Sequence, residues 1–247
     1  MPKRERIDLL LVQRGLAASR DRAKRLLLAG QVLVDDGVVD KAGTKVSVDA
    51  AIRLRGVDHP YVSRGGLKLA GALEDLGVDV VGLRCLDVGA STGGFTDCLL
   101  QRGATEVVAI DVGTNQLHNK LRQDPRVVSL EQTDIRAATR AQVGDVSLVV
   151  VDASFISLRL LLPPIAALIE TGTPVLALVK PQFEVGREQV GKGGVVREDS
   201  LREAAVEAVV AVARELGFSE AGRAESRIAG ARGGNREVFV MVAFEGR

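Results

Sequence analysis

The chain has few aromatic residues: its 247 residues include no tryptophan, one tyrosine and six phenylalanines. Apolar residues still make up 46% of the sequence, which is enough to bury a substantial core in one large and one small domain. That core must consist mainly of valine, leucine, isoleucine and alanine. Such residues are typical of strands buried on both faces of a parallel sheet, so the composition favours an α/β protein.

Cysteine is also scarce. Cys85 and Cys98 are the only two, and they match neither a disulfide framework nor the spacing of a zinc site. The N-terminus lacks the apolar centre of a signal peptide. The best apolar stretch, 158–169, is shorter than the ~20 residues of a membrane span and contains Arg159. These absences predict a cytoplasmic protein without disulfides or metal, and they argue against a membrane pore.

The net charge of +1 indicates no particular partner, but the charges are unevenly distributed. Residues 1–34 carry eight basic and three acidic side chains, whereas residues 61–247 carry 21 basic and 24 acidic ones. A basic head on a mildly acidic body predicts contact with a polyanion through the head, although a merely solvated basic face has the same composition. The basic residues of the head are Lys3, Arg4, Arg6, Arg14, Arg20, Arg22, Lys24 and Arg25.

The head has the pattern of a small αα-β domain. Apolar residues three and four apart predict two short helices, the second capped by Ser19 and ended by Gly30. Residues 31–34 and 46–54 have the composition of strands, and a tight turn is expected at 35–37.

The body alternates short apolar strands with helices, which predicts a doubly wound, Rossmann-like α/β sheet. Two final strands, 218–226 and 237–244, are expected to form an antiparallel hairpin at its edge. The domains are therefore predicted as 1–55 and 63–247, joined by a linker at 56–62. The central strands are expected at Leu83–Val88, Val107–Ile110, Val127–Leu130, Val146–Val151 and Val175–Val179, and a long helix at Leu201–Leu216.

A glycine-rich turn follows the first of these strands. Such a turn lets backbone N–H groups and a helix N-terminus approach a ligand closely. A dinucleotide and a purely structural turn are the alternatives. The spacing is not G-x-G-x-x-G, however, and Asp87 would repel a diphosphate but pair with an ammonium, so we predict S-adenosylmethionine as the cofactor. The predicted cofactor residues of the turn are Asp87, Gly89, Ala90, Ser91, Thr92, Gly93, Gly94 and Phe95. A bulky residue at Gly93 or Gly94 is expected to block the approach to the ligand.

Two further acids follow the next strands. Asp111 ends the second strand, where an acid in many nucleotide-binding α/β folds accepts hydrogen bonds from ribose hydroxyls. Asp134 follows the third strand, in a position suited to an adenine amino group. Acids at strand ends are also common caps, so only the combination with the glycine-rich turn predicts an adenosine site.

Two lysines and two acids are expected around the same crevice. Asp152 and Lys180 end the fourth and fifth strands, Lys68 precedes the sheet, and Glu237 opens the last strand. A ribose hydroxyl needs a base to attack a sulfonium methyl group, and a buried lysine beside a second cation can be that base. Lys180 is the expected base. Asp152 is expected to orient both lysines and to help position the ribose, and Glu237 is expected to hold Lys68.

These residues resemble a known family, the TlyA-type (haemolysin A) rRNA 2′-O-methyltransferases, relatives of the FtsJ/RrmJ methyltransferases, and the resemblance spans nearly the whole chain. The matching motifs are Arg6-Ile-Asp, Val12-x-Arg14-Gly15-Leu16 and Ser19-Arg20 of an S4 domain, Val62-Ser-Arg64-Gly-Gly-x-Lys68-Leu, Asp87-Val-Gly89-Ala-Ser-Thr-Gly-Gly-Phe-Thr96, Val151-Asp-Ala-Ser-Phe155-Ile-Ser-Leu, Val179-Lys-Pro-Gln-Phe183-Glu and Gly234-Asn-x-Glu237. The resemblance implies that Lys68, Asp152, Lys180 and Glu237 form a catalytic tetrad and that the turn binds S-adenosylmethionine.

The resemblance also implies the partner: cytidines of 23S rRNA, and in longer members of 16S rRNA as well. The chain ends ten residues after Glu237, which favours 23S rRNA, whereas the basic start resembles the longer class. An assembled ribosomal subunit and free rRNA both remain possible substrates. The predicted RNA-binding residues are Arg4, Arg6, Arg14, Arg20, Lys24, Arg25 and Arg64.

Other classes fit the residues less well. A pseudouridine synthase can carry a similar head, but its catalytic domain is mostly antiparallel. A non-catalytic RNA-binding assembly factor would have no use for both lysines and both acids of the tetrad. The segment 184–199 contains four glycines and three cations, and is either a mobile loop that closes over substrate or a simple connection.

Overall fold

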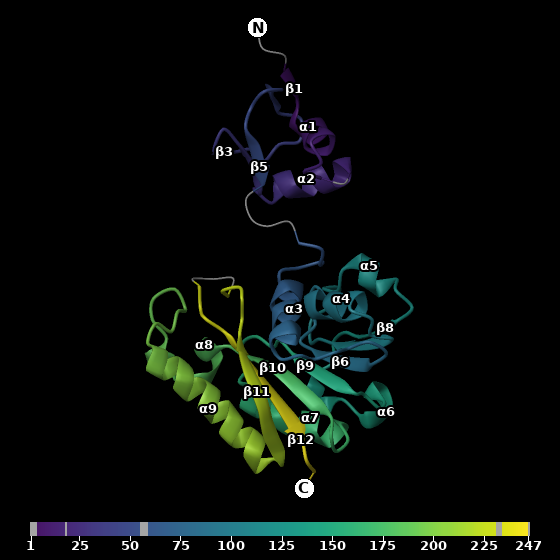
Figure 1. The fold of residues 1–247 in the computed structure, drawn as a ribbon, viewed down its shortest axis with the longest axis vertical. Coiled ribbons are helices and arrows are strands. Elements are labelled where there is room, and N and C mark those ends of the chain that lie inside the picture. Colours follow the sequence, from purple (N-terminus) through teal and green to yellow (C-terminus); the bar gives the residue numbers. More distant parts are fainter. Residues whose placement is uncertain (1–3, 18, 55–58, 231–233, 247) are drawn as a thin grey trace. The chain divides into compact units, whose positions relative to one another are not determined.

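The computed structural model describes residues 4–17, 19–54, 59–230 and 234–246. The chain divides into two compact units, residues 1–60 and 61–247 (Figure 1). Lys3, residues 56–58 of the predicted linker and residues 231–233 of the turn before the last strand lie outside the described residues.

The small unit packs two helices against short strands. Its apolar core contains Ile7 and Leu11 from the first helix, Leu26 and Leu27 from the second, and Val32 from a strand. One pair of strands is β1 with β4, and a second sheet has the order β3-β2-β5. The elements are β1 (Arg4–Arg6), α1 (Ile7–Gln13), α2 (Arg20–Leu28), β2 (Val32–Val34), β3 (Gly37–Val38), β4 (Lys45–Ser47) and β5 (Ile52–Leu54).

Most local predictions for the head are confirmed. Ser19 caps α2, because its Oγ accepts a hydrogen bond from the Arg22 N–H at 3.2 Å, and Gly30 follows the helix with φ +64°. The single strand predicted over 46–54 is wrong. Ser47 accepts hydrogen bonds from the next backbone N–H groups, including Asp49 N at 3.2 Å, and this turn divides the segment. Its two halves pair with different strands, β4 with β1 and β5 with β2. Strand β1 was not predicted.

The large unit is a doubly wound α/β domain, as the alternating pattern predicted. Its seven-stranded sheet has the order β11-β12-β10-β9-β6-β7-β8. The elements are α3 (Gly65–Asp75), β6 (Arg84–Val88), α4 (Gly94–Gln101), β7 (Glu106–Ile110), α5 (Asn119–Arg122), β8 (Val127–Leu130), η1 (Ile135–Ala137), α6 (Arg140–Val143), β9 (Leu148–Val151), α7 (Leu158–Leu168), β10 (Pro174–Val179), α8 (Pro181–Glu184), η2 (Arg187–Gln189), α9 (Asp199–Glu215), β11 (Phe218–Glu225) and β12 (Val238–Phe244).

The five central strands, β6 to β10, are parallel, and all five coincide with predicted apolar runs to within two residues. The last two strands form the predicted hairpin: β12 pairs antiparallel with both β10 and β11, which places β11 at the edge. The long helix α9 begins two residues earlier than expected.

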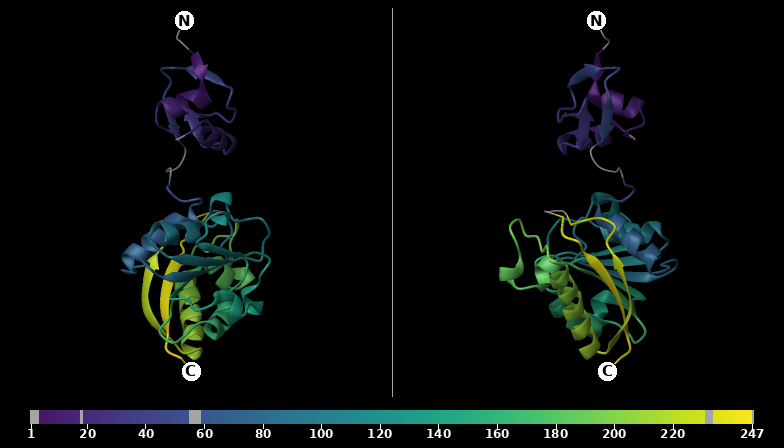
Figure 2. Two further views of the ribbon diagram at one scale, coloured as in Figure 1. Left: turned by 90° about the vertical axis from the view of Figure 1, so that its right-hand side faces the viewer. Right: turned by 60° about the vertical axis from the view of Figure 1, so that its left-hand side comes forward.

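Helices cover both faces of the sheet (Figures 1 and 2). Along β9, Val149 and Val151 belong to the core beneath α7 and α9, whereas Leu148 and Val150 belong to the core beneath α3 and α4. Because β7, β9 and β10 are almost entirely buried, their sequences are continuous apolar runs and not alternating ones. Strand β8, at the edge of the sheet, is only partly buried and exposes Ser129. Among the described residues, no helix is long and apolar enough to cross a membrane.

Candidate active site at the carboxyl edge of the sheet

The carboxyl ends of the parallel strands bring the predicted site residues together. Asp111, Asp152 and Lys180 are the first residues after β7, β9 and β10, and the glycine-rich turn follows β6. In open α/β sheets this edge is where ligands bind, at the point where the order of the strands reverses. Here the reversal lies between β6 and β9.

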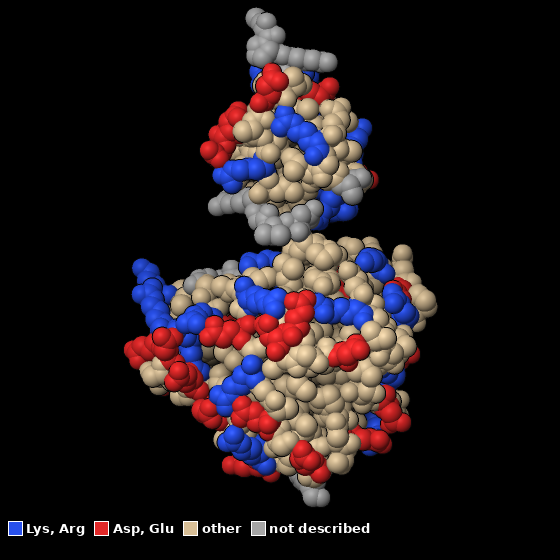
Figure 3. Space-filling model, in the orientation of Figure 1, with Lys and Arg blue, Asp and Glu red and all other residues tan. Residues whose placement is uncertain are grey.

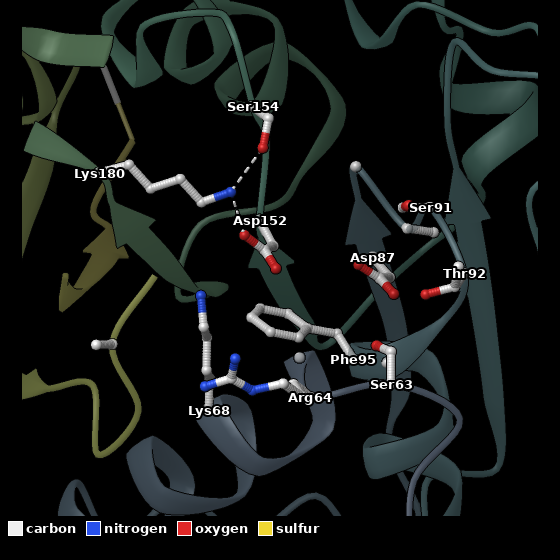
Figure 4. A pocket seen from close by; sticks show the side chains of 15 residues that line it. Ser63, Arg64, Lys68, Asp87, Ser91, Thr92, Phe95, Asp152, Ser154 and Lys180 are labelled. Carbon is white, nitrogen blue, oxygen red and sulfur yellow. Dashed lines mark hydrogen bonds and ion pairs between the residues drawn. The ribbon is translucent and has the colours of Figure 1, made fainter. Parts of the chain in front are cut away.

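A cavity of about 400 Å³ lies at this point (Figure 4). It brings together residues from the start of α3, the glycine-rich turn and the ends of β9 and β10. Its lining residues are Ser63, Arg64, Gly65, Lys68, Asp87, Gly89, Ala90, Ser91, Thr92, Gly94, Phe95, Asp152, Ser154, Lys180 and Ala229. Three of the four predicted tetrad residues therefore border one cavity, together with most of the predicted turn.

Each lysine of the predicted tetrad has its own carboxylate. Lys180 Nζ lies 2.6 Å from Asp152 Oδ1 and donates a hydrogen bond to Ser154 Oγ at 2.9 Å, as Figure 4 shows. Lys68 forms an ion pair and hydrogen bond with Glu237. The sequence-based expectation that Asp152 orients both lysines is therefore not met in this geometry, because the described contacts of Asp152 involve Lys180 alone.

Glu237 lies behind the cavity and does not line it. Its side chain is 3% exposed, and its partner Lys68 is also largely buried. An ion pair removed from water in this way is strongly destabilised when one partner is lost. Glu237 thus holds Lys68 in place from outside the cavity, as expected.

Asp87 is fully buried at the end of β6 and borders the cavity. Its Oδ2 accepts a hydrogen bond from Thr96 Oγ1 at 2.6 Å, while Oδ1 has no hydrogen-bond partner among the described residues. Burial raises the pKa of this carboxyl group to about 7. A buried, half-satisfied carboxylate at the cavity wall fits a cationic ligand group.

The glycine-rich turn is held by internal hydrogen bonds. Gly89 and Ala90 both donate to the Ile110 carbonyl, and Ser91 N donates to Asp111 Oδ2 at 2.8 Å. Asp111 Oδ1 also accepts from Gly113 N at 2.7 Å. Several N–H groups of the turn are therefore already used, but each Asp111 oxygen retains a second lone pair for a ligand hydroxyl.

The reason given for Gly93 and Gly94 needs correction, because a side chain at either would first meet the protein and not a ligand. A Cβ on Gly93 would collide with Leu121, and one on Gly94 would collide with Ser63 and lie 2.9 Å from Gly66 N. These glycines let the N-termini of α3 and α4 approach each other and let the turn pack on α5.

A second cavity of about 470 Å³ continues from the first, since the two share lining residues at Gly89, Ser91, Asp152 and Ser154. Asp111 and Asp134 both line it. The Asp134 carboxylate is already paired with Arg136 Nη2 at 2.5 Å, and this pairing holds the pKa of Asp134 below its usual range. A hydrogen bond from an adenine amino group would therefore share that carboxylate with Arg136.

The predicted RNA-binding residues differ in what their side chains do. Arg4, Arg20, Lys24 and Arg25 are exposed on the small unit, and Arg64 is exposed at the rim of the cavity. Arg14 is also exposed, but its guanidinium donates to the carbonyls of Val48 and Ala50 and so holds the turn between β4 and β5. Figure 3 shows that Lys and Arg side chains alternate with acidic ones on the visible faces of both units.

Three functional candidates had no role assigned from the sequence. Ser154 contacts Lys180, Ser63 lines the cavity, and the buried Asn235 binds the segment before α9. All three lie within the quoted motifs, which was the one available signal. Their roles depend on contacts between distant segments, so spacing along the chain could not reveal them.

A model of the FtsJ-like methyltransferase family matches residues 61–244, and a model of the S4 domain matches residues 5–52. The chain is 48% identical to the 16S/23S rRNA (cytidine-2′-O)-methyltransferase TlyA of Mycobacterium tuberculosis over 244 residues, which is 98% of this chain and 91% of that protein. It is 42% identical to the 23S rRNA (cytidine-2′-O)-methyltransferase TlyA of Campylobacter jejuni over 140 residues, 56% of this chain and 54% of that protein.

A solved structure is similar over both units. It is the structure of a protein described as a hemolysin from Streptococcus thermophilus, 46% identical to this chain, with a TM-score of 0.76. The similarity covers 99% of this chain and 89% of that one. The matches therefore extend over the small unit as well as the large one.

Proposed function

The chain belongs to the FtsJ-like methyltransferase family, with an S4 domain at its N-terminus, and we propose that it transfers the methyl group of S-adenosylmethionine to the 2′-hydroxyl of a cytidine in ribosomal RNA. One observation carries the proposal: Lys68, Asp152 and Lys180 border a single cavity beside the glycine-rich turn. The names of two relatives, from M. tuberculosis and C. jejuni, supply the acceptor class.

The two units divide the work in this proposal. Residues 1–55 bind RNA as an S4 domain, residues 56–62 link the domains, and residues 63–247 carry the transfer. Tyr61 and Val62, at the end of the predicted linker, belong to the large unit, where Val62 N donates to Asp97 Oδ2 at 2.8 Å. A Cβ on Gly66 would collide with Tyr61. The catalytic unit therefore holds the final residues of the linker against α3 and α4.

The cofactor site extends along both cavities. Asp87 fits the ammonium group, because Oδ1 is buried without a partner, and Asp111 and Asp134 face the second cavity, where the adenosine belongs in this proposal. When bound, S-adenosylmethionine supplies an electrophilic methyl carbon on a sulfonium sulfur. Gly89 lets the turn lie close to the end of β9, since a Cβ there would be 3.0 Å from the Asp152 carbonyl.

Lys180 is the proposed base. Asp152 and Ser154 fix its Nζ at the cavity wall, and the amine accepts the proton of the ribose hydroxyl as the oxygen attacks the methyl carbon. Lys180 would thereby take up the one proton released when the methyl group is transferred, and Asp152 would balance the charge of the resulting ammonium. Positioning of the two reactants in a site shielded from water supplies much of the acceleration in such a displacement.

Lys68 completes the site from α3. Glu237 neutralises its charge, and its ammonium points into the same cavity, where it can hold the ribose oxygens of the acceptor (Figure 4). We propose that both units bind RNA and that the RNA substrate is part of a ribosomal subunit.

The test is methyl transfer itself. Purified protein is incubated with labelled S-adenosylmethionine and rRNA, and the modified ribose is mapped by mass spectrometry. We expect label on a cytidine 2′-oxygen, with a loss of about 10²–10⁴-fold in kcat for Lys180→Ala. Arg140→Ala, which removes an exposed cation at the start of α6 that lines neither cavity, is the control. Label on a base, or unchanged kcat in Lys180→Ala, would refute the proposed reaction.

A further inference from the structure

The small unit contains a fully buried carboxylate, Asp8, and an aspartate is rarely buried in this way unless it is paired. Asp8, in the first turn of α1, is 0% exposed. Its two partners are arginines from different elements, Arg6 at the end of β1 and Arg20 at the start of α2. The side chains of these arginines are 42% and 53% exposed.

Both arginines share one oxygen atom of Asp8. Arg6 binds the carboxylate through two nitrogens, Nε to Oδ1 at 3.0 Å and Nη2 to Oδ2 at 3.1 Å. Arg20 Nη2 also donates to Oδ2, again at 3.1 Å. The two guanidinium groups are thus held side by side by a single buried oxygen, with the rest of each group toward solvent.

We propose that Asp8 is a positioning residue that makes Arg6 and Arg20 into a clamp for one backbone phosphate of the RNA. The inference rests on the proposed function, since it names the chemistry by which the S4 domain holds its RNA. Guanidinium groups match phosphate oxygens through paired N–H donors, and a second arginine allows both sides of one phosphate to be bound.

The charges at the clamp favour an anion. Two arginines and one carboxylate leave a net positive charge, and Arg6 holds the pKa of Asp8 below its usual range despite burial, so the carboxylate is ionised at neutral pH. Two further acids lie beside the clamp, and both have partners. Glu5 Oε1 accepts from Arg6 N at 2.8 Å, and Asp21 pairs with Lys24 at 3.2 Å.

Rigid arginines bind a phosphate better than mobile ones. A long side chain that must be ordered on binding reduces affinity, and Asp8 orders two of them before RNA arrives. A charge-only view makes the opposite prediction, because removing an acid from a basic surface strengthens binding to a polyanion. The two views therefore differ in the sign of one measurable effect.

The experiment compares Asp8→Asn with Asp21→Asn in the full-length protein. Both remove one negative charge from the same unit, but Asp21 is exposed and contacts neither arginine in the described contacts. Affinity for transcribed 23S rRNA is measured by filter binding over a series of salt concentrations. We expect Asp8→Asn to bind roughly tenfold more weakly than wild type, since two side chains lose their ordering, while Asp21→Asn binds as tightly or slightly more tightly.

A second variant protects the test against misfolding of Asp8→Asn. The double variant Arg6→Lys/Arg20→Lys keeps every charge but cannot form paired N–H contacts with a phosphate. We expect it to bind rRNA more weakly than wild type, with unchanged S-adenosylmethionine affinity and a cooperative thermal transition. Wild-type affinity in this double variant, or tighter binding by a folded Asp8→Asn, would overturn the clamp. Failure of wild type itself to bind rRNA would overturn the proposed function, whereas the outcomes above would overturn the clamp alone.

Discussion

At the scale of single residues, the site contains a carboxylate that is costly in the free protein. Asp87 is buried, one of its oxygens has no partner among the described residues, and its pKa is raised to about 7. Such a group is stable as a neutral acid and unstable as an anion until a cation is bound. Function and stability therefore make opposite demands at this position.

We predict that Asp87→Asn weakens S-adenosylmethionine binding by more than about tenfold, because a charged hydrogen bond to the ammonium is lost. The same change should stabilise the free protein at high pH. The native carboxyl group of wild type binds its proton more tightly than the unfolded one, so its contribution to stability is complete below about pH 4 and is lost as the pH rises through about 7. Calorimetry of binding, and thermal melts at pH 5 and pH 8, measure both effects; a stability difference that shrinks toward pH 8 would contradict the assignment.

Gly94 gives a prediction about packing. A Cβ there would press on Ser63 and on the backbone of Gly66, so Gly94→Ala should separate the N-termini of α3 and α4. We expect a loss of about 1–3 kcal/mol in the free energy of unfolding, the usual cost of overpacking. Gly43→Ala is the control, because a Cβ there meets no atom within 4 Å and the backbone does not have a positive φ. Denaturant unfolding measures the difference, and equal stability of Gly94→Ala and wild type would disprove the packing role.

At the scale of elements, one buried amide joins the last strand to the loop before α9. Asn235 Oδ1 accepts from Val196 N at 2.9 Å, and its Nδ2 donates to Gly194 O at 2.7 Å. Glu237, two residues later, holds Lys68. A short stretch of chain therefore fixes both the loop and one lysine of the site.

We predict that Asn235→Ala loosens the segment 184–199. The buried Val196 N–H would lose its partner, at a cost of about 1–3 kcal/mol. Limited proteolysis should then cut within this segment faster than in wild type, while Lys192→Ala, which removes only an exposed cation, should not change the rate. Unchanged protection in Asn235→Ala would show that other contacts hold the loop.

At the scale of the whole molecule, the two units have separate apolar cores. We predict that residues 61–247 alone retain S-adenosylmethionine affinity within about threefold but lose most rRNA affinity and its steep salt dependence, because the arginines proposed to bind phosphate are concentrated in the small unit. Calorimetry and filter binding on the truncated and intact chains measure this. Equal rRNA methylation by both would exclude the head as the RNA anchor.

The choice of rRNA is also a property of the whole molecule. The relatives from M. tuberculosis and C. jejuni have 23S rRNA in common in their names, and the former adds 16S rRNA. We predict that 23S rRNA in the large subunit is the main substrate. The test is to incubate the protein and labelled cofactor with separate small and large ribosomal subunits and to measure the label in each rRNA. Comparable label in 16S and 23S rRNA would disprove the preference for 23S rRNA.

The sequence by itself determined the α/β class, the family and the residues at the carboxyl ends of the strands. The reason is that strands buried on both faces must be continuous apolar runs, so the residue at which each run stops is visible along the chain. Asp111, Asp152 and Lys180 could be placed in this way, whereas Asp87 lies within its run, one residue before the end of β6. The helix cap at Ser19 was equally local.

Only the tertiary structure decided which groups pair. Lys68 could have met Asp152 or Glu237, and the packing of α3 beside the last hairpin gave it Glu237. The division of 46–54 into two strands, and the sharing of one Asp8 oxygen by two arginines, likewise depend on segments that are distant in sequence. Spacing along a chain records periodicity and turns, whereas ion pairs and buried hydrogen bonds follow from how the folded elements meet in space.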